Sequence, residues 1–573
     1  MARVIGIDVG GTNTHAALLQ DGKLIATARC PTDQQDLLVG AAAVLEELLA
    51  ALPRATPEDL ELHLSTTLTT NAIVAGRHEP TAAVIVPGPG VNPAELKFPF
   101  PTYVIGGAVD HRGRETAPLD RAALRQALAA IRKSGVAAVA LVGKFSVRNP
   151  RHELEMAELV QQEFSEIKGI TLGHRLSGRL NFPRRVITAV LNAGVSRLQA
   201  DFAVMVRQLA ERRGIGERIF LLKADGGTMP LAESLVRPVE TVLSGPAASI
   251  MGALAWGAPR QKVAVSLDIG GTTTEIAVLL DGEPLGERDG AVVAGYRTLI
   301  PALFTRSVGL GGDSRITWRD GELHIGPERA GPPAALAGPT LTPTDAVIAL
   351  TDTGLGNRDL AWAELQRFGQ SGGWGGEELA REIVATFCTR LAAEIQAVFT
   401  ALNRRPVYTV AEVLAPADLK PEKLIGMGGP AAYFIPKLAA QMGLDFETLP
   451  YAAAANAVGA AASRPTVAVN LRADTALGTL AVPELDELGP LPRPRLFDVR
   501  QARELIRAKT VDYAARAGVG VGTAQVEITE EEIFNVVRGF YTTGRIYTLQ
   551  AQVKPEVQRV TTSNASTKES NDG

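Results

Sequence analysis

The sequence predicts an α/β protein in which one structural unit occurs twice. Of its 573 residues, 46% are hydrophobic and only 5% aromatic, a composition typical of an α/β enzyme rather than of a disordered or fibrous chain. Two nearly identical stretches, DVGGTNTH at residues 8–15 and DIGGTTTE at residues 268–275, each lie between two apolar runs. Apolar runs joined by a Gly/Thr turn are typical of paired antiparallel strands. We therefore expect one such hairpin in each copy.

The residues of the two turns are suited to binding phosphate. Paired glycines let the backbone come within hydrogen-bonding distance of a phosphate, and backbone amides and threonine hydroxyls can donate to its oxygens. An aspartate on the incoming strand can hold a hydrated cation. A plain hairpin turn is the alternative, but a shared pattern of Asp, Gly-Gly and two Thr favours a function. Two such turns facing each other would hold the phosphates of one nucleotide from both sides.

Length, charge and cysteine content narrow the classes of function. The length predicts two to four domains. The 58 basic and 62 acidic residues give a net charge of −4 without a long basic run, so we expect no nucleic-acid partner. Cys30 and Cys388 are too distant for a disulfide framework or a CxxC metal site. No apolar stretch approaches about 18 residues, so we expect no membrane span and a cytoplasmic protein.

The N-terminal region, residues 1–190, is expected to carry the first phosphate loop. Residues 4–30 alternate like a three-stranded meander, and residues 37–52 have helical spacing. The stretch LHLSTTLTTNAIVAGR, residues 62–77, predicts a strand, a turn and a helix. Its many small donors suit helix capping and equally suit oxyanion binding, so both interpretations stay open.

A second region, residues 191–463, is expected to carry the second phosphate loop. Ser244-Gly245-Pro246 stops a strand before a helix of small residues, which either faces a phosphate or packs closely on a sheet. The segment KLIGMGGPAAY, residues 423–433, predicts a strand that ends in Gly-Met-Gly-Gly. The helix expected over residues 452–462 has small residues on every face, so it must pack very closely against another element.

The pattern changes after residue 463. Residues 464–559 form a separate C-terminal region with a Pro-rich link and a helix expected over residues 499–516. Residues 560–573 are polar and are expected to form a disordered tail.

These segments, in this order, resemble a known family. The two loops are similar to the phosphate loops of the actin, Hsp70 and sugar-kinase superfamily. The whole set resembles the large, A-type subunit of the hydantoinase/oxoprolinase family, ATP-dependent enzymes that open cyclic amides. The motifs that carry this resemblance are DVGGTNT, TTLTTNAI, VAAVALVGKFSVRNPRHE, LSGPAASIMGA, DIGGTTTE, SVGLGGDS, GPERAG to PTDA, GMGGPAAY and NAVGAA. They cover most of residues 1–463.

The resemblance implies a fold, two cofactors and a set of site residues. The implied fold has duplicated actin-like, ribonuclease-H-like ATPase domains around a nucleotide cleft, plus a small C-terminal region, and the implied cofactors are ATP and Mg²⁺. The first phosphate loop would comprise Asp8, Gly10, Gly11, Thr12 and Asn13. The second loop would comprise Asp268, Gly270, Gly271, Thr272 and Thr273. The adenosine motif would comprise Gly426, Gly428 and Gly429. Asp8 and Asp268 would hold the metal, and catalysis would involve Asp8, Asp268, Thr272 and Glu275.

The implied chemistry is phosphorylation of an amide oxygen. The carbonyl oxygen of a hydantoin, 5-oxoproline or related lactam would attack the γ-phosphate, and the resulting imidate ester would accept water and lose phosphate. The resemblance also implies a second, B-type subunit as a partner and leaves a homo-oligomer open. A small-molecule kinase of the sugar or pantothenate type is one alternative, and a reactivating or assembly ATPase is another.

The chain departs from the family pattern at several places. His15 stands where the family usually has Asp after the first loop, whereas Glu275 keeps a carboxylate at the matching place in the second. We expect His15 to face solvent or the interdomain cleft. The family's Cys-containing stretch appears here as PPAALAG, so a metal site built on that cysteine is lost, although Asp345 remains. Leu64-Ser65 replace a usual His-Gly.

Overall fold

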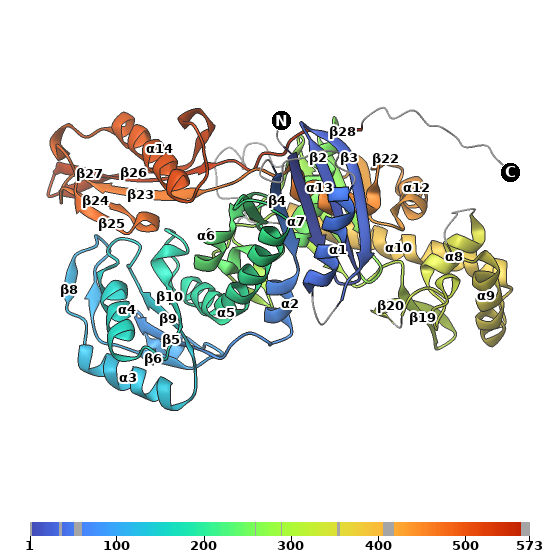
Figure 1. The fold of residues 1–573 in the computed structure, drawn as a ribbon. Helices are drawn as coiled ribbons and strands as arrows, with labels where there is room; N and C mark the ends of the chain where they lie inside the picture. The colour runs from blue at the N-terminus through green and yellow to red at the C-terminus, as the bar shows by residue number, and fades with distance from the viewer. Residues whose placement is uncertain are drawn as a thin grey trace.

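The fold is given by a computed structural model (Figure 1), which describes residues 3–33, 37–50, 60–257, 259–287, 289–329, 331–351, 356–404 and 418–562. Two mixed sheets form the centre of the molecule, as expected for a duplicated α/β fold. The first has the strand order β12-β11-β4-β1-β2-β3-β28. Its strands are β1 (Arg3–Val9), β2 (Asn13–Gln20), β3 (Lys23–Pro31), β4 (Leu60–Thr66), β11 (Ile219–Leu222), β12 (Thr228–Pro230) and β28 (Thr561–Thr562).

The second sheet repeats the pairing of the first. Its order is β15-β14-β13-β21-β22, with β18 also paired to β14. In each sheet the central strand pairs antiparallel with the strand that follows the phosphate loop and parallel with a later strand on its other side. The strands are β13 (Val263–Ile269), β14 (Thr274–Leu280), β15 (Glu283–Pro284), β18 (Thr305–Val308), β21 (Lys423–Met427) and β22 (Asp445–Thr448). The duplication predicted from the sequence is therefore confirmed.

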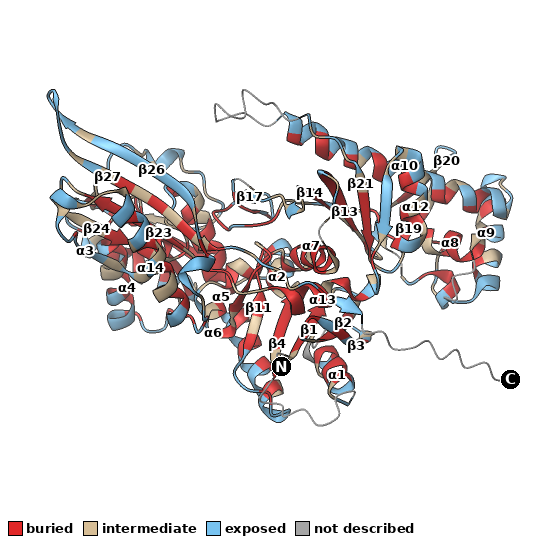
Figure 2. Ribbon diagram, turned by 90° about the horizontal axis from the view of Figure 1, so that it is seen from above, coloured by how far each residue is buried: buried red, intermediate tan, exposed pale blue. Residues whose placement is uncertain are grey.

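Two helices lie between the sheets, α7 (Ser244–Trp256) and α13 (Ala455–Ala462). Figure 2 shows α7 among the buried strands of both sheets. The contact needs residues without side chains: a Cβ atom at Gly252 would lie 2.3 Å from the Ala455 carbonyl oxygen, and one at Gly459 would lie 2.0 Å from that of Ala248. A Cβ at Gly6 on β1 would lie 2.1 Å from the Ala457 oxygen. The close packing expected for this small-residue helix is thus backbone against backbone.

A third domain is inserted after α2 (Leu68–Val74). Its parallel sheet has the order β10-β9-β5-β6. The elements are β5 (Thr81–Val86), β6 (Thr102–Val104), β9 (Ala138–Gly143), β10 (Gly169–Leu172), α3 (Arg121–Lys133), α4 (Arg151–Glu163) and α5 (Phe182–Arg212). The boundary expected at residue 190 falls inside α5, which corrects that expectation. One half of α5 packs on the inserted sheet through Val186, and the other half packs on the first sheet through Phe202.

The second half also carries its own insertion and its own core. The strands are β19 (Ser314–Arg319) and β20 (Glu322–Arg329), and the helices are α8 (Pro343–Leu350), α9 (Arg358–Gly372), α10 (Gly376–Asn403) and α12 (Ala431–Met442). Within the described residues, α10 is the one helix long and apolar enough to cross a membrane, which differs from the expectation that no such stretch occurs. Its side chains Phe387, Leu391 and Ile395 are buried in the core of this half, as in a core helix.

The C-terminal region is an antiparallel sheet covered by α14 (Val499–Arg516), with the order β25-β24-β23-β27-β26. Its strands are β23 (Ala468–Asp474), β24 (Thr479–Val482), β25 (Glu487–Pro490), β26 (Val526–Arg538) and β27 (Tyr541–Val553). It lies on the inserted domain (Figure 1), where Nε2 of His174 is 2.7 Å from Asp486 Oδ1.

The chain then returns to the first sheet, which corrects the expected start of the tail. Val560 is 2% exposed and packs with Val4 and Ala17, and β28 pairs parallel with β3. Residues 560–562 are therefore part of the fold. The rest of the expected tail, residues 563–573, lies outside the described residues.

Candidate active site

Asp8 and Asp268 lie close together between the two sheets, where the charge of Asp268 acts on Asp8. Asp8 is on β1 and Asp268 on β13, and the two helices between the sheets supply the side chains that connect them. Ser249 of α7 places its hydroxyl 2.5 Å from Asp268 Oδ2, and the side-chain amide of Asn456 on α13 donates to the same oxygen at 3.3 Å. Asn456 also hydrogen bonds to Asp8. The two loops of the duplicated fold therefore meet at one site.

Burial and mutual repulsion act on this pair of carboxylates. Burial raises the pKa of Asp8 to about 6, and the charge of Asp268 adds to this, while Ser65 and Asn456 partly offset it. Burial also raises the pKa of Asp268, against the hydrogen bonds from Ser249 and Asn456. Two buried like charges are stabilised by a cation between them. The donor set therefore fits Mg²⁺, which binds proteins through one or two carboxylates plus phosphate oxygens.

The described residues contain no group of three or more His, Cys, Asp or Glu placed to hold a metal. Asp345, the remaining member of the family's cysteine stretch, instead accepts hydrogen bonds from the backbone amides of Ala334, Ala335 and Thr342 at 2.7–3.1 Å. It closes a capping box at the start of α8, so its role here is structural.

The two phosphate loops make the same turn. The amide of Gly10 donates to the Asn13 carbonyl at 3.2 Å, and that of Gly270 donates to the Thr273 carbonyl at 2.9 Å. Gly11 and Thr12 at the tip of the first loop are exposed, and so is Thr272 in the second. A Cβ atom at Gly11 would meet no atom within 4 Å, which leaves the tip of this loop open.

Residues 309–314 cover the second loop. The amides of Gly312 and Asp313 donate to the carbonyls of Gly270 and Gly271 at 2.9 and 2.7 Å. A Cβ atom at Gly271 would lie 2.6 Å from Asp313 Oδ2, so glycine is required for this contact. The second loop is thus fixed by its own half of the molecule.

Arg329, at the end of β20, joins the two loops. Its Nη1 donates to the Thr12 hydroxyl at 3.1 Å, and its Nη2 donates to Asp313 Oδ2 at 3.0 Å. Its Nε is buried and has no hydrogen-bond partner among the described residues. Sequence reasoning did not single out Arg329 or Asp313, although both lie in quoted motifs, GPERAG and SVGLGGDS. Asn456 and Ser249 were missed in the same way, within NAVGAA and LSGPAASIMGA.

His15 and Glu275 occupy matching places beside the two aspartates. His15 pairs with Asp8 across β1 and β2, and Glu275 pairs with Asp268 across β13 and β14. Burial and then the charge of Arg29 lower the pKa of His15 to about 4, so it is neutral. Burial raises the pKa of Glu275, and Asp268 adds to this, although Ser307 donates to Glu275 at 2.6 Å.

Several of the residues expected to bind the nucleotide make other contacts in the structure. The Asn13 side-chain oxygen already accepts two hydrogen bonds from Arg29 at 3.2 and 3.3 Å. Gly426 is buried in β21, and a Cβ there would lie 2.4 Å from Ile435 on α12, so this glycine is needed for packing. Gly428 has φ +89°, and a Cβ there would lie 2.3 Å from the Ile269 oxygen. Only Gly429 of this motif faces open space, with nothing within 4 Å.

The TTLTTNAI segment binds the start of its own helix and a second segment of the chain: the Thr66 hydroxyl accepts from the amide of Leu68, the first residue of α2, at 3.2 Å. Oxyanion binding by this segment stays a prediction. Thr67 precedes α2 but makes no side-chain capping hydrogen bond. Two other groups of the segment accept hydrogen bonds from residues 243 and 244: the Thr70 hydroxyl accepts from the amide of Leu243 at 2.9 Å, and the Thr66 carbonyl accepts from the Ser244 hydroxyl at 2.9 Å. The segment therefore holds the start of α7 in place, with Leu243 in a left-handed conformation at φ 56°.

Comparisons with known proteins agree with this geometry. Residues 4–164 match the model of the hydantoinase/oxoprolinase N-terminal region, and residues 185–469 match that of hydantoinase/oxoprolinase. The caprolactamase alpha subunit of Pseudomonas jessenii is 26% identical over 57% of this chain and 50% of its own length. The acetophenone carboxylase gamma subunit of Aromatoleum aromaticum is 26% identical over 60% and 53%. The chain thus spans about half the length of these curated relatives.

Solved structures show the same fold over nearly the whole chain. The ATP-dependent caprolactamase from Pseudomonas jessenii has a TM-score of 0.71 at 21% identity, covering 98% of this chain and 88% of that one. The nucleotide-free acetone carboxylase has a TM-score of 0.68 at 17% identity, covering 97% and 89%. With both family models matched, at residues 4–164 and 185–469, the chain belongs to the hydantoinase/oxoprolinase family.

Proposed function

We propose that this chain is an ATP-dependent hydrolase subunit that opens a cyclic amide through phosphorylation of the amide oxygen. The observation that carries the proposal is the meeting of Asp8, Asp268 and both phosphate loops at one site, with Asn456 hydrogen bonded to both carboxylates. The named functions of several relatives support the substrate class, among them the caprolactamase alpha subunit and 5-oxoprolinase 1 of Arabidopsis thaliana.

The residues of this site have distinct roles in this proposal. The amides of Gly10, Gly11, Gly270 and Gly271 and the hydroxyls of Thr12 and Thr272 would donate to the phosphates. Asp8 and Asp268 would hold Mg²⁺, which neutralises phosphate charge as the bond to ADP breaks. Arg329 already contacts Thr12 and has an unpaired Nε, so it can turn its donors to a phosphoryl group in the same place.

The proposed reaction balances as follows. The amide oxygen forms a bond to the γ-phosphorus, and the bond between that phosphorus and ADP breaks. One water then adds to the activated carbon, and the ring C–N bond breaks to give the free amine and an acyl phosphate. A second water attacks this acyl phosphate, and its bond to phosphate breaks to give the carboxylate and free phosphate. One lactam, one ATP and two water molecules give one amino acid, ADP and phosphate. Glu275, whose carboxyl is partly kept from ionising by burial and Asp268, is placed beside this chemistry.

We also propose a second, B-type subunit as partner and a cytoplasmic location. Two relatives are named as subunits, one of caprolactamase and one of acetophenone carboxylase, which supports a multi-subunit enzyme. Free thiols at Cys30 and Cys388 support a reducing compartment.

A substrate screen tests the proposed function. ATP hydrolysis is measured with hydantoin, 5-oxoproline and caprolactam, with and without the product of a neighbouring gene, and the products are identified by mass spectrometry. A ring-opened amino acid with ADP and phosphate is the expected result. A stable phosphorylated product would indicate a kinase instead, and ADP and phosphate without any altered small molecule would indicate an assembly ATPase. An Asp268→Asn variant serves as the control for contaminating ATPases.

A further inference from the structure

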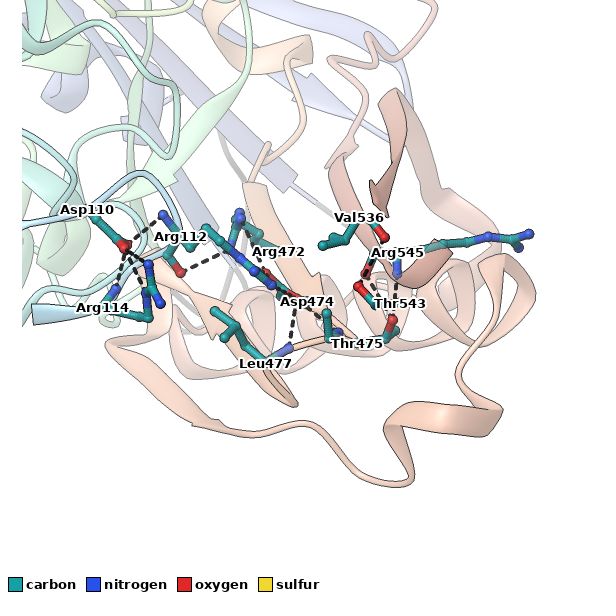
Figure 3. A network of polar contacts seen from close by, with 11 residues as sticks. Asp110, Arg112, Arg114, Arg472, Asp474, Thr475, Leu477, Val536, Thr543 and Arg545 are labelled. Atoms are coloured by element: carbon teal, nitrogen blue, oxygen red, sulfur yellow. Dashed lines mark hydrogen bonds and ion pairs between the residues drawn. The ribbon is translucent and has the colours of Figure 1, made fainter. Parts of the chain in front are cut away.

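Four arginines line a cavity of about 430 Å³ where the inserted domain meets the C-terminal domain. Figure 3 shows three of them, Arg112, Arg114 and Arg472, with the carboxylates beside them. Arg112, Arg114 and Arg148 come from the inserted domain, and Arg472 comes from β23. The opposite wall is formed by β24, β25 and the turn before β24. A cavity of this size is in the range of small-molecule sites.

The two carboxylates beside these arginines are already engaged. Asp474, whose side chain is fully buried, binds Arg112 at 2.7–3.0 Å and accepts the amides of Ala476 and Leu477 at 3.0 Å. Asp110 accepts Nε of Arg114 at 2.7 Å and two backbone amides of its own turn. Four guanidinium groups thus face two carboxylates, each of which is bound by a different arginine.

Arg472 and Arg148 are left without a close carboxylate. Arg472 is 9% exposed, its Nε has no hydrogen-bond partner among the described residues, and its Nη2 is 3.9 Å from Asp474 Oδ2. Arg148 forms no ion pair within the part of the chain that the structure describes, and its guanidinium lies 5.5 Å from the centre of the Phe145 ring. Among the described residues, these are thus the two arginines of the cluster that no carboxylate binds at hydrogen-bonding distance.

The pKa values of Arg148 and Arg472 are both lowered in this cluster. Burial and then the charge of Arg472 lower the pKa of Arg148 to about 10, although the charge of Asp110 acts in the opposite direction. Burial also lowers the pKa of Arg472, and Arg112 adds to this, although Asp474 acts in the opposite direction. Burial is the main cause for both arginines, and the neighbouring positive charges in the cluster add to it.

The cluster is held in a fixed geometry by its own backbone. Gly113 has φ +88°, and a Cβ there would lie 2.9 Å from the Arg148 carbonyl oxygen. Asn149 donates to the Gly113 carbonyl at 2.9 Å, and Arg472 Nη1 donates to the Arg112 carbonyl at 3.4 Å. The turn at residues 110–114, the segment around Arg148 and β23 are thus tied together before any ligand arrives.

We propose that this arginine cavity binds a small oxyanion of two or more charges, a phosphate or a polycarboxylate, and that the anion joins the inserted domain to the C-terminal domain. Planar guanidinium groups bind the paired oxygens of both groups through parallel hydrogen bonds. Arg148, which forms no ion pair among the described residues, and the Nε of Arg472, which has no hydrogen-bond partner there, supply the donors, and the ligand supplies additional negative charge.

The test uses the full chain and two probes, pyrophosphate and tricarballylate, without nucleotide or metal. Binding is measured by calorimetry in a low-chloride buffer, with ionic strength matched by sodium chloride. The variant is Arg148→Gln. Its matched control is Arg125→Gln, which removes the same charge from an exposed arginine of the same domain that is paired with Glu163. Gly11→Val, which obstructs the open phosphate loop, separates this cavity from the nucleotide site.

We expect saturable binding of at least one probe that weakens about tenfold or more in Arg148→Gln and is unchanged in Arg125→Gln and Gly11→Val. Tighter binding of pyrophosphate would assign a phosphate ligand, and tighter binding of tricarballylate a carboxylate ligand. Without anion, Arg148→Gln should melt no lower than the wild type, because it relieves repulsion. If it does not fold, Arg472→Gln is measured in its place. Equal binding to Arg148→Gln and wild type, or equal loss in Arg125→Gln, would overturn the proposal.

Discussion

The tip of the first phosphate loop is open, whereas residues 309–314 cover the second loop. Both make the same turn, with the Gly10 amide bound to Asn13 and the Gly270 amide bound to Thr273. The second is further held by Gly312 and Asp313, while the tip of the first loop is joined to the other half through Arg329. The two copies thus share the turn of the loop but differ in the contacts that hold it. The first loop therefore depends on the second half for part of its position, through Arg329.

The largest expected effect comes from removing the carboxylate of Asp268, which lies where the two phosphate loops meet. Asp268→Asn should lower the rate of ATP hydrolysis by roughly 10²–10³-fold, because it removes one of two carboxylates available to the metal and to the developing phosphate charge. Circular dichroism should show an unchanged fold. Turnover close to that of the wild type would contradict the assignment of Asp268 to the site.

Arg329 tests the bridge between the two loops. Arg329→Ala should raise the KM for ATP about tenfold, because it removes a charged donor to the phosphate region and the connection to Thr12. Arg315→Ala is the matched control, since Arg315 lies on the neighbouring strand and its ion pair in the part of the chain that the structure describes is an exposed one, with Glu328 at 3.7 Å. Equal KM values for ATP in both variants would contradict a role for Arg329 in binding the phosphates.

Glu275 and His15, which lie beside the two aspartates, should differ in their effect on the rate of ATP hydrolysis. Glu275→Gln removes a charge that is coupled to Asp268, so it should change ATP hydrolysis by up to roughly tenfold and shift its pH profile. His15→Gln replaces a neutral ring and should change the rate by no more than about twofold. The two variants are compared in one assay across pH. A larger change in rate for His15→Gln than for Glu275→Gln would contradict this prediction.

A stability measurement tests the burial of Asp8. Its pKa in the folded protein is about 6 against an ordinary value of 3.8, so the folded state binds the proton more tightly than the unfolded chain. The ionised carboxylate therefore destabilises the fold above pH 6, by up to roughly 3 kcal/mol. Asp8→Asn should raise the melting temperature at pH 7.5, and the difference should shrink toward pH 4. A constant difference across this range would contradict the raised pKa.

The local parts of this fold and site could be predicted from the sequence. Each phosphate hairpin is set by apolar alternation around a Gly-Gly turn, which is why the strands on both sides of Asp8 and Asp268 were expected. The small residues of α13 likewise predicted its close packing. Both signals come from residues adjacent in sequence, where spacing determines structure directly.

The long-range parts could not be predicted in this way. The inserted domain separates β4 from β11, which pair across more than 150 residues of chain by number (66 to 219), and nothing in the local pattern of α5 marks its two packing surfaces. Arg329 reaches Thr12 only because the two halves face each other. Gly426 and Asp345 were assigned from motifs, but packing against Ile435 and a helix cap explain them.

Equilibrium binding of MgATP to Gly11→Val and Gly429→Val tests the central claim most directly. The two glycines come from opposite halves, and each faces space that a side chain could enter without disturbing the fold. If the duplicated halves form one nucleotide site, calorimetry should show one MgATP bound per wild-type chain and loss of binding in each variant alone. Wild-type affinity in either variant, or half of the binding retained, would contradict a shared site.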